Sequence, residues 1–209
     1  MICILDCGSS KVPYIEEMVD EFCDYTTIPI LEFSAERLQE FKGVLISGAP
    51  ILITEQNISS YLNQVEWIKS TPIPVLGICF GHQLIGLTFG AFGSRMKEDR
   101  DWQVIEAFEE SILFQKLPQE VEMMEDHCET ISIPANFKLI ASSDACVNEA
   151  MEHSELPLFG IQFHPEVSGN HGRIVIENFV NFCLNRAQLL FLTINVERNL
   201  IPSEFNAFI

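Results

Sequence analysis

The sequence predicts an α/β fold with a mostly parallel central sheet, helices on both of its faces and a small antiparallel extension. Short apolar runs rich in β-branched residues alternate with amphipathic segments of helical spacing in the first half of the chain. This alternation favours parallel strands joined by helices. Farther along, two runs alternate polar with apolar residues, as half-buried antiparallel strands do.

The elements follow one another in a regular order. We expect three strand and helix pairs first: Ile2–Leu5 with Tyr14–Phe22, Ile28–Leu31 with Ala35–Phe41, and Val44–Ile46 with Ile58–Ile68. The apolar run Pro74–Leu76 then leads into a helix at Leu84–Phe89. The alternating runs Trp102–Phe108 and Glu120–Met124 predict the antiparallel extension, before the chain returns through Leu139–Ser142.

Cys79 lies on a sharp turn between an apolar strand and a helix. Gly77 and Gly81 stand two positions before and after it. A side chain in such a turn often takes positive φ, and the glycines let neighbouring backbone pass close by. The unpaired amides at the helix N-terminus favour the thiolate, which is the form that attacks carbon. The pattern therefore predicts a reactive cysteine.

A base for this cysteine is found in a second motif. An apolar strand ends in His164, and Glu166 follows two residues later. An imidazole can shuttle a proton near pH 7, and a carboxylate can fix its tautomer and stabilise its cation. Ser47, Cys79 and His164 all follow strands, so we expect them at the same edge of the sheet. Cys79, His164 and Glu166 thus form a candidate catalytic triad.

Three segments resemble those of the class I (triad) glutamine amidotransferases, most closely their guanosine-monophosphate-synthetase-like branch. GICFGHQL at Gly77–Leu84 resembles the nucleophile segment, FGIQFHPEV at Phe159–Val167 the His/Glu segment, and VLISGAP at Val44–Pro50 the oxyanion strand and loop. The resemblance covers about Met1 to Cys183.

This resemblance implies a flavodoxin-like fold and hydrolysis of the side-chain amide of L-glutamine through a γ-glutamyl thioester. Cys79 would be the nucleophile, His164 the acid and base, and Glu166 the residue that orients the imidazole. The ammonia would pass to a separate synthetase, with GMP synthetase as the candidate.

The resemblance also implies backbone donors for the oxyanion. They are the amides of Phe80, after the cysteine, and of Gly48 and Ala49, in the oxyanion loop. Ala49 stands where the family usually has a second glycine. Alanine keeps the N–H but resists positive φ by roughly 1 kcal/mol or more.

Substrate-binding residues follow from the same likeness. Gln83 resembles the family residue that helps to hold glutamine. Asp126, His127 and Cys128 belong to a segment whose backbone meets the α-carboxylate of the substrate in the family. Cys128 replaces a glycine of the family pattern.

Other polar residues have simpler interpretations. We expect His82 to cap its helix or pack locally, and His153 and His171 to be solvated. A metal site at residues 126–129 is disfavoured because structural zinc sites need four ligands at characteristic spacings, and no Cys-x-x-Cys pair occurs. We therefore expect no metal and no cofactor.

The composition limits the domain count and the partners. A chain of 209 residues that is 47% hydrophobic can bury one sizeable core. We expect an amidotransferase domain at 1–186 and an apolar tail at 187–209. The net charge of −18 argues against binding to nucleic acids or anionic membranes. Seven cysteines without redox-pair spacing, and a start unlike a signal peptide, favour the cytoplasm.

The tail and the functional class leave alternatives open. Leu189–Ile209 either packs back on the domain or covers a partner or a second copy of the chain, and its charged residues argue against a membrane span. The leading function is a glutaminase subunit that serves a separate synthetase, because no Gly-rich nucleotide loop accompanies the triad. The alternatives are a stand-alone γ-glutamyl hydrolase or peptidase and a non-catalytic regulatory subunit.

Overall fold

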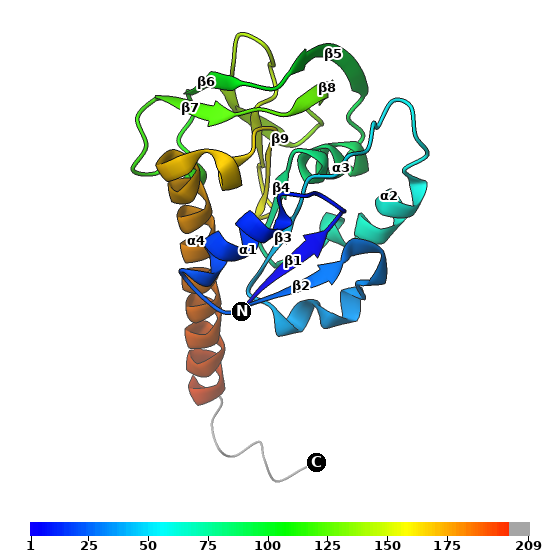
Figure 1. Cartoon of the computed structure of the whole chain (residues 1–209). Coiled ribbons are helices and arrows are strands. Elements are labelled where there is room, and N and C mark those ends of the chain that lie inside the picture. Colours follow the sequence, from blue (N-terminus) through cyan, green and yellow to red (C-terminus); the bar gives the residue numbers. More distant parts are fainter. Residues whose placement is uncertain (201–209) are drawn as a thin grey trace.

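A nine-stranded sheet forms the centre of the molecule, in the order β2-β1-β3-β4-β11-β10-β9-β6-β7 (Figure 1). The computed structural model describes the backbone of residues 1–200 and the side chains of residues 1–187. The first five strands in this order are parallel to one another. They are β2 (Tyr25–Pro29), β1 (Ile2–Asp6), β3 (Gly43–Ile46), β4 (Val75–Ile78) and β11 (Leu158–Ile161).

The antiparallel extension continues the same sheet. It consists of β10 (Ala150–His153), β9 (Phe137–Ser142), β6 (Trp102–Ala107) and β7 (Glu120–Met124). A separate two-stranded sheet pairs β5 (Gly93–Asp99) with β8 (His127–Ile131). The predicted fold class is therefore confirmed, with the parallel strands in one half of the sheet and the antiparallel strands in the other.

Helices cover both faces of the parallel half (Figure 1). On one face lie α1 (Val12–Asp20) and α4 (Gly169–Leu200), and on the other lie α2 (Ser59–Val65) and α3 (Phe80–Thr88). Short 3₁₀ helices occupy several connections. They are Ile30–Glu32, Ala35–Glu40, Glu66–Lys69, Ile112–Phe114 and Pro165–Val167.

Strand β1 shows why the centre of the sheet needs apolar residues on both sides. Successive side chains of a strand point to opposite faces. Ile2 and Ile4 pack in the core formed with α1 and α4, whereas Cys3 and Leu5 pack in the core formed with α2 and α3. A parallel strand that is buried on both faces needs a continuous run of apolar residues, and the sequence of β1 has such a run.

Two predicted elements differ in detail from the structure. The second strand spans Tyr25–Pro29 rather than Ile28–Leu31, and it ends at Pro29 because Ile30–Glu32 forms a 3₁₀ helix. The helical segment at Ala35–Phe41 is a 3₁₀ helix instead of an α-helix. No helix among the described residues is long and apolar enough to cross a membrane.

The predicted division of the chain into a domain at 1–186 and an apolar tail at 187–209 stays a prediction. Helix α4 runs through the proposed boundary without a break. The side chains of the tail from residue 188 onward lie outside the described residues.

Two glycines of α3 provide a matched test of the packing beside the sheet. A Cβ added at Gly81 would overlap the backbone oxygen of Ile46, whereas one added at Gly86 would meet the flexible end of the Ile131 side chain. Alanine improves helix propensity equally at both positions. We expect Gly81→Ala to lower the free energy of unfolding by about 2 kcal/mol more than Gly86→Ala, because backbone cannot move aside as a side chain can. Urea denaturation of both variants measures the difference, and equal stabilities would contradict it.

Candidate active site

Cys79 occupies the strained turn that its motif predicts. It lies between β4 and α3 with φ 50° and ψ −104°. Its backbone N–H donates a 2.8 Å hydrogen bond to the carbonyl oxygen of Ile161 in β11. A Cβ at Gly77 would overlap backbone atoms of Gly81, so only glycine lets the strand pass this close to the helix. The turn therefore fixes the cysteine at the carboxyl end of β4.

His164 and Glu166 meet Cys79 at the same edge of the sheet. The His164 ring contacts the Cys79 side chain, and its Nδ1 lies 2.7 Å from Oε1 of Glu166. A Cβ built on Gly48 would lie 3.3 Å from Cε1 of His164 and 3.6 Å from Cβ of Cys79, which places the loop after β3 beside both residues. Segments that are distant in sequence thus converge here.

Backbone contacts hold the His164 segment in place. The N–H of His164 donates to the carbonyl oxygen of Met124 at 2.9 Å, and the Ser168 hydroxyl donates to the carbonyl oxygen of His164 at 2.6 Å. The same hydroxyl accepts a 2.9 Å hydrogen bond from the N–H of Met124. The antiparallel extension, through β7, therefore supports the imidazole.

The environment of His164 favours its charged form. Burial opposes the charge, but the contacts with Cys79 and Glu166 outweigh burial and raise the pKa of His164 to about 10. An imidazolium held between a sulfur and a carboxylate is the arrangement expected of a thiolate–imidazolium pair. Burial raises the pKa of Cys3, Cys7 and Cys146 to about 12, so these thiols stay protonated near neutral pH.

A cavity of about 430 Å³ opens beside the sulfur. Phe80 and Ala49, two of the predicted oxyanion donors, line it together with Cys79 and His164. Neither Gly48 nor Ala49 has positive φ.

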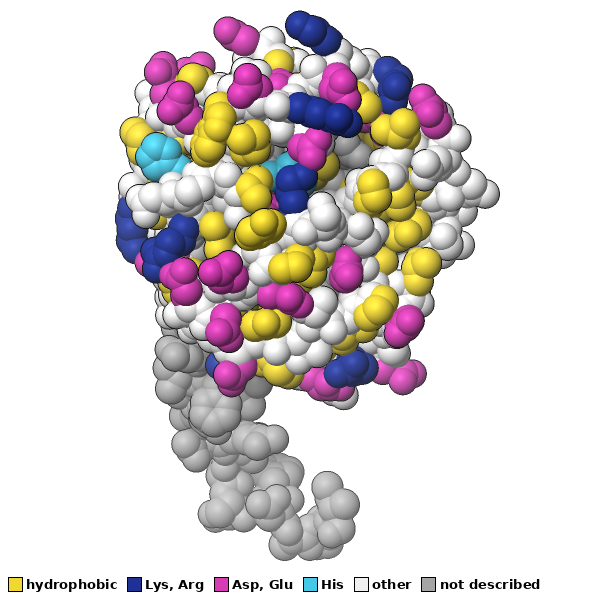
Figure 2. All heavy atoms as spheres, viewed as in Figure 1, with side chains coloured by type: hydrophobic (Ala, Val, Ile, Leu, Met, Phe, Trp, Pro, Cys, Tyr) yellow, Lys and Arg dark blue, Asp and Glu magenta, His cyan; other side chains and the backbone are white. Residues whose placement is uncertain are grey.

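Acidic side chains are spread over the face shown in Figure 2, whereas basic ones are fewer. Lys11 and Arg100 are basic residues that line the cavity.

Gln83 also lines this cavity, but its amide is already engaged. Its Nε2 donates to the backbone oxygen of Glu129 at 3.3 Å and to Oε1 of Gln162 at 3.2 Å. Gln162 in turn points its Nε2 to the Cys79 sulfur at 3.5 Å. The Gln83 side chain therefore orients a second amide toward the sulfur, and its predicted contact with substrate stays a prediction.

The segment 126–129 lines the opposite wall of the cavity, and its side chains diverge. The Asp126 carboxylate forms ion pairs with Lys11 and with Arg100. Burial acts to raise the pKa of this carboxyl, but the contact with Lys11 outweighs burial and the pKa is lowered. Cys128 accepts a 3.4 Å hydrogen bond from Arg95, and His127 turns its ring into the interior. These residues do not form a metal site among themselves.

Glu129 anchors a neighbouring loop. Its buried carboxylate accepts hydrogen bonds from the backbone amides of Ile53 and Thr54, at 2.6 and 3.1 Å, and from the Thr54 hydroxyl. These residues closely follow the oxyanion loop in sequence. The contact therefore fixes one side of the cavity to strand β8.

Sequence reasoning missed Gln162, Lys11 and Arg100. Gln162 stands two residues before His164 in an extended segment, so a period of two could have placed both on one side. Lys11 and Arg100 are brought to the cavity only by tertiary packing, and no local pattern marks them.

Two histidines give different outcomes. His82 is fully buried and packs against Gly160, as local packing predicts, and burial lowers the pKa of His82 to about 3. The prediction for His153 was wrong, because this ring is buried and accepts 3.0 Å hydrogen bonds from the amides of Glu155 and Leu156. Its turn-like sequence folds over the ring and covers it.

The chain is similar to known proteins over most of its length. Residues 3–182 match the family model of the class-I glutamine amidotransferases. The glutamine-hydrolysing GMP synthase subunit of Pyrococcus furiosus is 39% identical over 160 residues, which are 75% of this chain and 82% of that protein. Its counterpart in Methanocaldococcus jannaschii is 32% identical over 191 residues, 88% of this chain and 97% of the relative. A crystal structure of a candidate GMP synthase subunit from Thermoplasma acidophilum superposes with a TM-score of 0.83 at 29% identity, covering 90% of this chain and 96% of that one.

The charge of His164 should depend on the sulfur beside it. We expect Cys79→Ala to move the pKa of His164 from about 10 toward its ordinary value of 6.5, because burial then opposes the charge without the contact to sulfur. At a pH between the midpoints of the two proteins, the ring is protonated in the wild type and neutral in the variant. NMR titration of the histidine side chains measures this, with Cys23→Ala as the control. The same midpoint in all three proteins would contradict the assigned contact.

Proposed function

The chain belongs to the class-I glutamine amidotransferases, and we propose that it is a glutaminase subunit that delivers ammonia to a separate GMP synthetase. The observation that carries this proposal is the convergence of Cys79 and His164 at one cavity, with Glu166 bound to the far side of the imidazole. The similarity to glutamine-hydrolysing GMP synthase subunits supports the choice of partner.

The reaction would begin with attack of the Cys79 sulfur on the side-chain amide carbon of L-glutamine. Negative charge then develops on the amide oxygen, and the backbone amides of Phe80 and of the Gly48–Ala49 loop would receive it. His164 donates its proton to the departing nitrogen, which leaves as ammonia, and a γ-glutamyl thioester remains on the sulfur.

Water would complete the cycle. The neutral His164 ring takes a proton from a water molecule, which attacks the thioester carbon, and glutamate leaves as the thiolate re-forms. Glu166 holds the ring through Nδ1 at 2.7 Å and stabilises the imidazolium in both half-reactions. Gln162, whose amide points at the sulfur, is a positioning residue for the nucleophile.

The wall of the cavity suits the amino-acid part of the substrate. Lys11 and Arg100 carry positive charge beside the Asp126 carboxylate. A free amino acid presents one carboxylate and one ammonium group, so both charges can find a partner here. We infer that the backbone of residues 126–128 and these two cations receive the α-carboxylate.

Partner and compartment follow from the same proposal. The relatives named as GMP synthase subunits support a separate synthetase as the protein that uses the ammonia. All seven cysteines are free, which supports a reducing compartment such as the cytoplasm. Self-association through the tail stays a prediction.

Replacement of the nucleophile tests the activity. We expect Cys79→Ala to lower glutamine hydrolysis, measured with the synthetase partner present, by roughly 10⁴-fold or more, because the variant lacks the sulfur that would form the thioester. Cys23→Ala, which changes a cysteine outside the cavity, should keep wild-type turnover. Ammonia release and circular dichroism of both variants separate lost chemistry from lost folding.

Two results would overturn the proposal. Retained glutaminase activity in folded Cys79→Ala would refute the nucleophile. Strong turnover of γ-glutamyl peptides without a partner, unchanged when the synthetase is added, would indicate a stand-alone hydrolase instead.

Ala49 tests whether the oxyanion loop must rearrange. If the loop flips into a positive-φ form during turnover, Ala49→Gly relieves about 1 kcal/mol, and kcat with the partner present should rise about fivefold. The substitution keeps the N–H donor, so KM should change little. Unchanged or lower kcat would show that the negative φ of the structure is the working conformation.

A further inference from the structure

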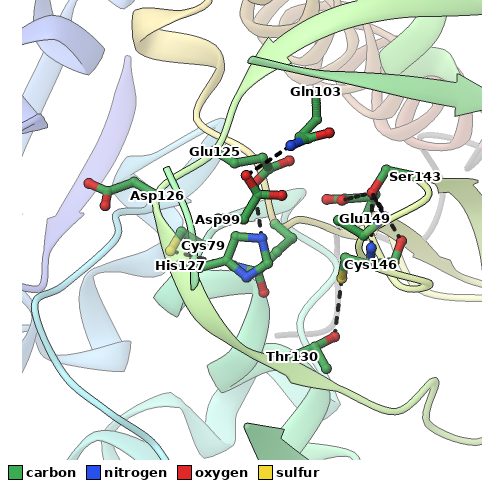
Figure 3. Close-up of polar contacts among 12 residues, drawn as sticks. Cys79, Asp99, Gln103, Glu125, Asp126, His127, Thr130, Ser143, Cys146 and Glu149 are labelled. Atoms are coloured by element: carbon green, nitrogen blue, oxygen red, sulfur yellow. Dashed lines mark hydrogen bonds and ion pairs between the residues drawn. The ribbon is translucent and has the colours of Figure 1, made fainter. Parts of the chain in front are cut away.

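A group of buried side chains lies behind the candidate active site and has no part in the proposed reaction. It consists of Glu125, His127, Cys146 and Glu149, hereafter the inner cluster (Figure 3). Glu125 and His127 come from the segment that leads into β8, and Cys146 and Glu149 from the connection between β9 and β10. All four are at least nine-tenths buried.

The inner atoms of this cluster face one another without hydrogen-bond partners. One ligand atom from each of His127, Cys146 and Glu149 lies within 4.8 Å of the other two. Oε2 of Glu125 lies 3.2 Å from Nε2 of His127. Both carboxylate oxygens of Glu125, Oε2 of Glu149 and Nε2 of His127 make no hydrogen bond within the described chain. Buried polar atoms are normally satisfied, so this convergence needs an explanation.

The outer atoms of the same residues are held. Nδ1 of His127 donates to the backbone oxygen of Glu129 at 2.9 Å, which leaves the Nε2 lone pair free of a proton when the ring is neutral. The Thr130 hydroxyl lies 3.2 Å from the Cys146 sulfur, and the Ser143 hydroxyl donates to Oε1 of Glu149 at 2.6 Å. Support of this kind on the outer side is typical of residues that bind a metal on the inner side.

We propose that the inner cluster is a binding site for one divalent metal ion of the zinc type. Imidazole nitrogen, thiolate and carboxylate are the ligands that zinc takes, and four protein ligands make a tetrahedral structural site. Bonds of about 2.0–2.3 Å place the ligand atoms of such a site roughly 3.3–3.8 Å apart, so His127, Cys146 and Glu149 need only a small inward movement to bind one ion. Glu125, which contacts His127, is the candidate fourth ligand.

Charge gives a second argument for a cation. Among the described residues, no lysine or arginine forms an ion pair with Glu125 or Glu149. The nearby Asp99 carboxylate adds negative charge and is itself bound by Gln103 at 3.0 Å. Burial raises the pKa of Cys146, Glu125 and Glu149, so without a metal these groups hold protons. A divalent ion would replace those protons, and with one thiolate and two carboxylates it would leave a charge of −1.

The inner cluster differs from the metal site at residues 126–129 that the sequence disfavours. Of that segment, only His127 takes part, while Cys146 and Glu149 lie in a separate loop. With four protein ligands the ion has no open position for a substrate, so its role would be structural. It would tie the cavity segment around His127 to the connection after β9, whether or not the chain is a glutaminase.

A cobalt titration tests the site. The full chain should carry Cys79→Ala, because Cys79 and His164 could themselves bind a metal. After treatment with a chelator, Co²⁺ should produce the sulfur-to-cobalt charge-transfer band and the intense visible bands of a tetrahedral ion, saturating at roughly one ion per chain. Adding Cys146→Ala should abolish the charge-transfer band, whereas adding Cys128→Ala, beside His127, should leave it.

A second variant keeps the test valid if the protein with Cys146→Ala does not fold. Glu149→Gln keeps the size of the side chain and an oxygen for the Ser143 hydroxyl, and should weaken Co²⁺ binding at least tenfold. Zn²⁺ should raise the thermal unfolding midpoint of the Cys79→Ala protein, and should do so much less in Cys79→Ala/Glu149→Gln.

Two results would overturn the proposal. One is no charge-transfer band and no Zn²⁺-dependent stabilisation in the Cys79→Ala protein, which would mean that protons, not a metal, neutralise the cluster. The other is an equal band in the protein with Cys146→Ala, which would place the metal elsewhere.

Discussion

The strained turn at Cys79 is the constraint on which the rest of the site depends. A positive φ at a residue with a Cβ is unfavourable, and here it is held by close packing of Gly77 against Gly81 and by the hydrogen bond from Cys79 to Ile161. That hydrogen bond joins the turn to β11, the strand whose continuation carries His164. The conformation that places Cys79 at the cavity and the register that places the imidazole beside it are therefore set by the same contact between β4 and β11.

The parallel and antiparallel halves of the mixed sheet contribute different parts of the site. The parallel half brings the ends of β3, β4 and β11 together, as expected for ligand sites in such sheets. The antiparallel half supports His164 through Met124 of β7, and the separate β5–β8 pair supplies residues 127–129 of the cavity wall. Loss of either half would leave the sulfur without a partner or without a pocket, so the site needs both.

Much of this arrangement could be predicted from the sequence, because local patterns encode it. The Gly77–Gly81 spacing, the strand before His164 and the alternation of runs identify the turn, the base and the fold. The remainder depends on packing between distant segments. Nothing near Gln83 indicates that its amide bonds Gln162, and nothing near Cys146 indicates that it faces His127 from another loop. The prediction for His153 failed because polar neighbours in sequence do not reveal that Phe89 and Phe137 pack on its ring.

Cys79, alone among the seven cysteines, should form a covalent intermediate with the γ-carbonyl of glutamine. An electrophilic glutamine analogue, added with the synthetase partner present and followed by peptide mass spectrometry, tests this most directly. We predict a single adduct on the peptide that contains Cys79 and protection of that residue by excess glutamine. An active complex in which Cys79 stays unmodified, or in which another cysteine carries the adduct, would contradict the assigned nucleophile.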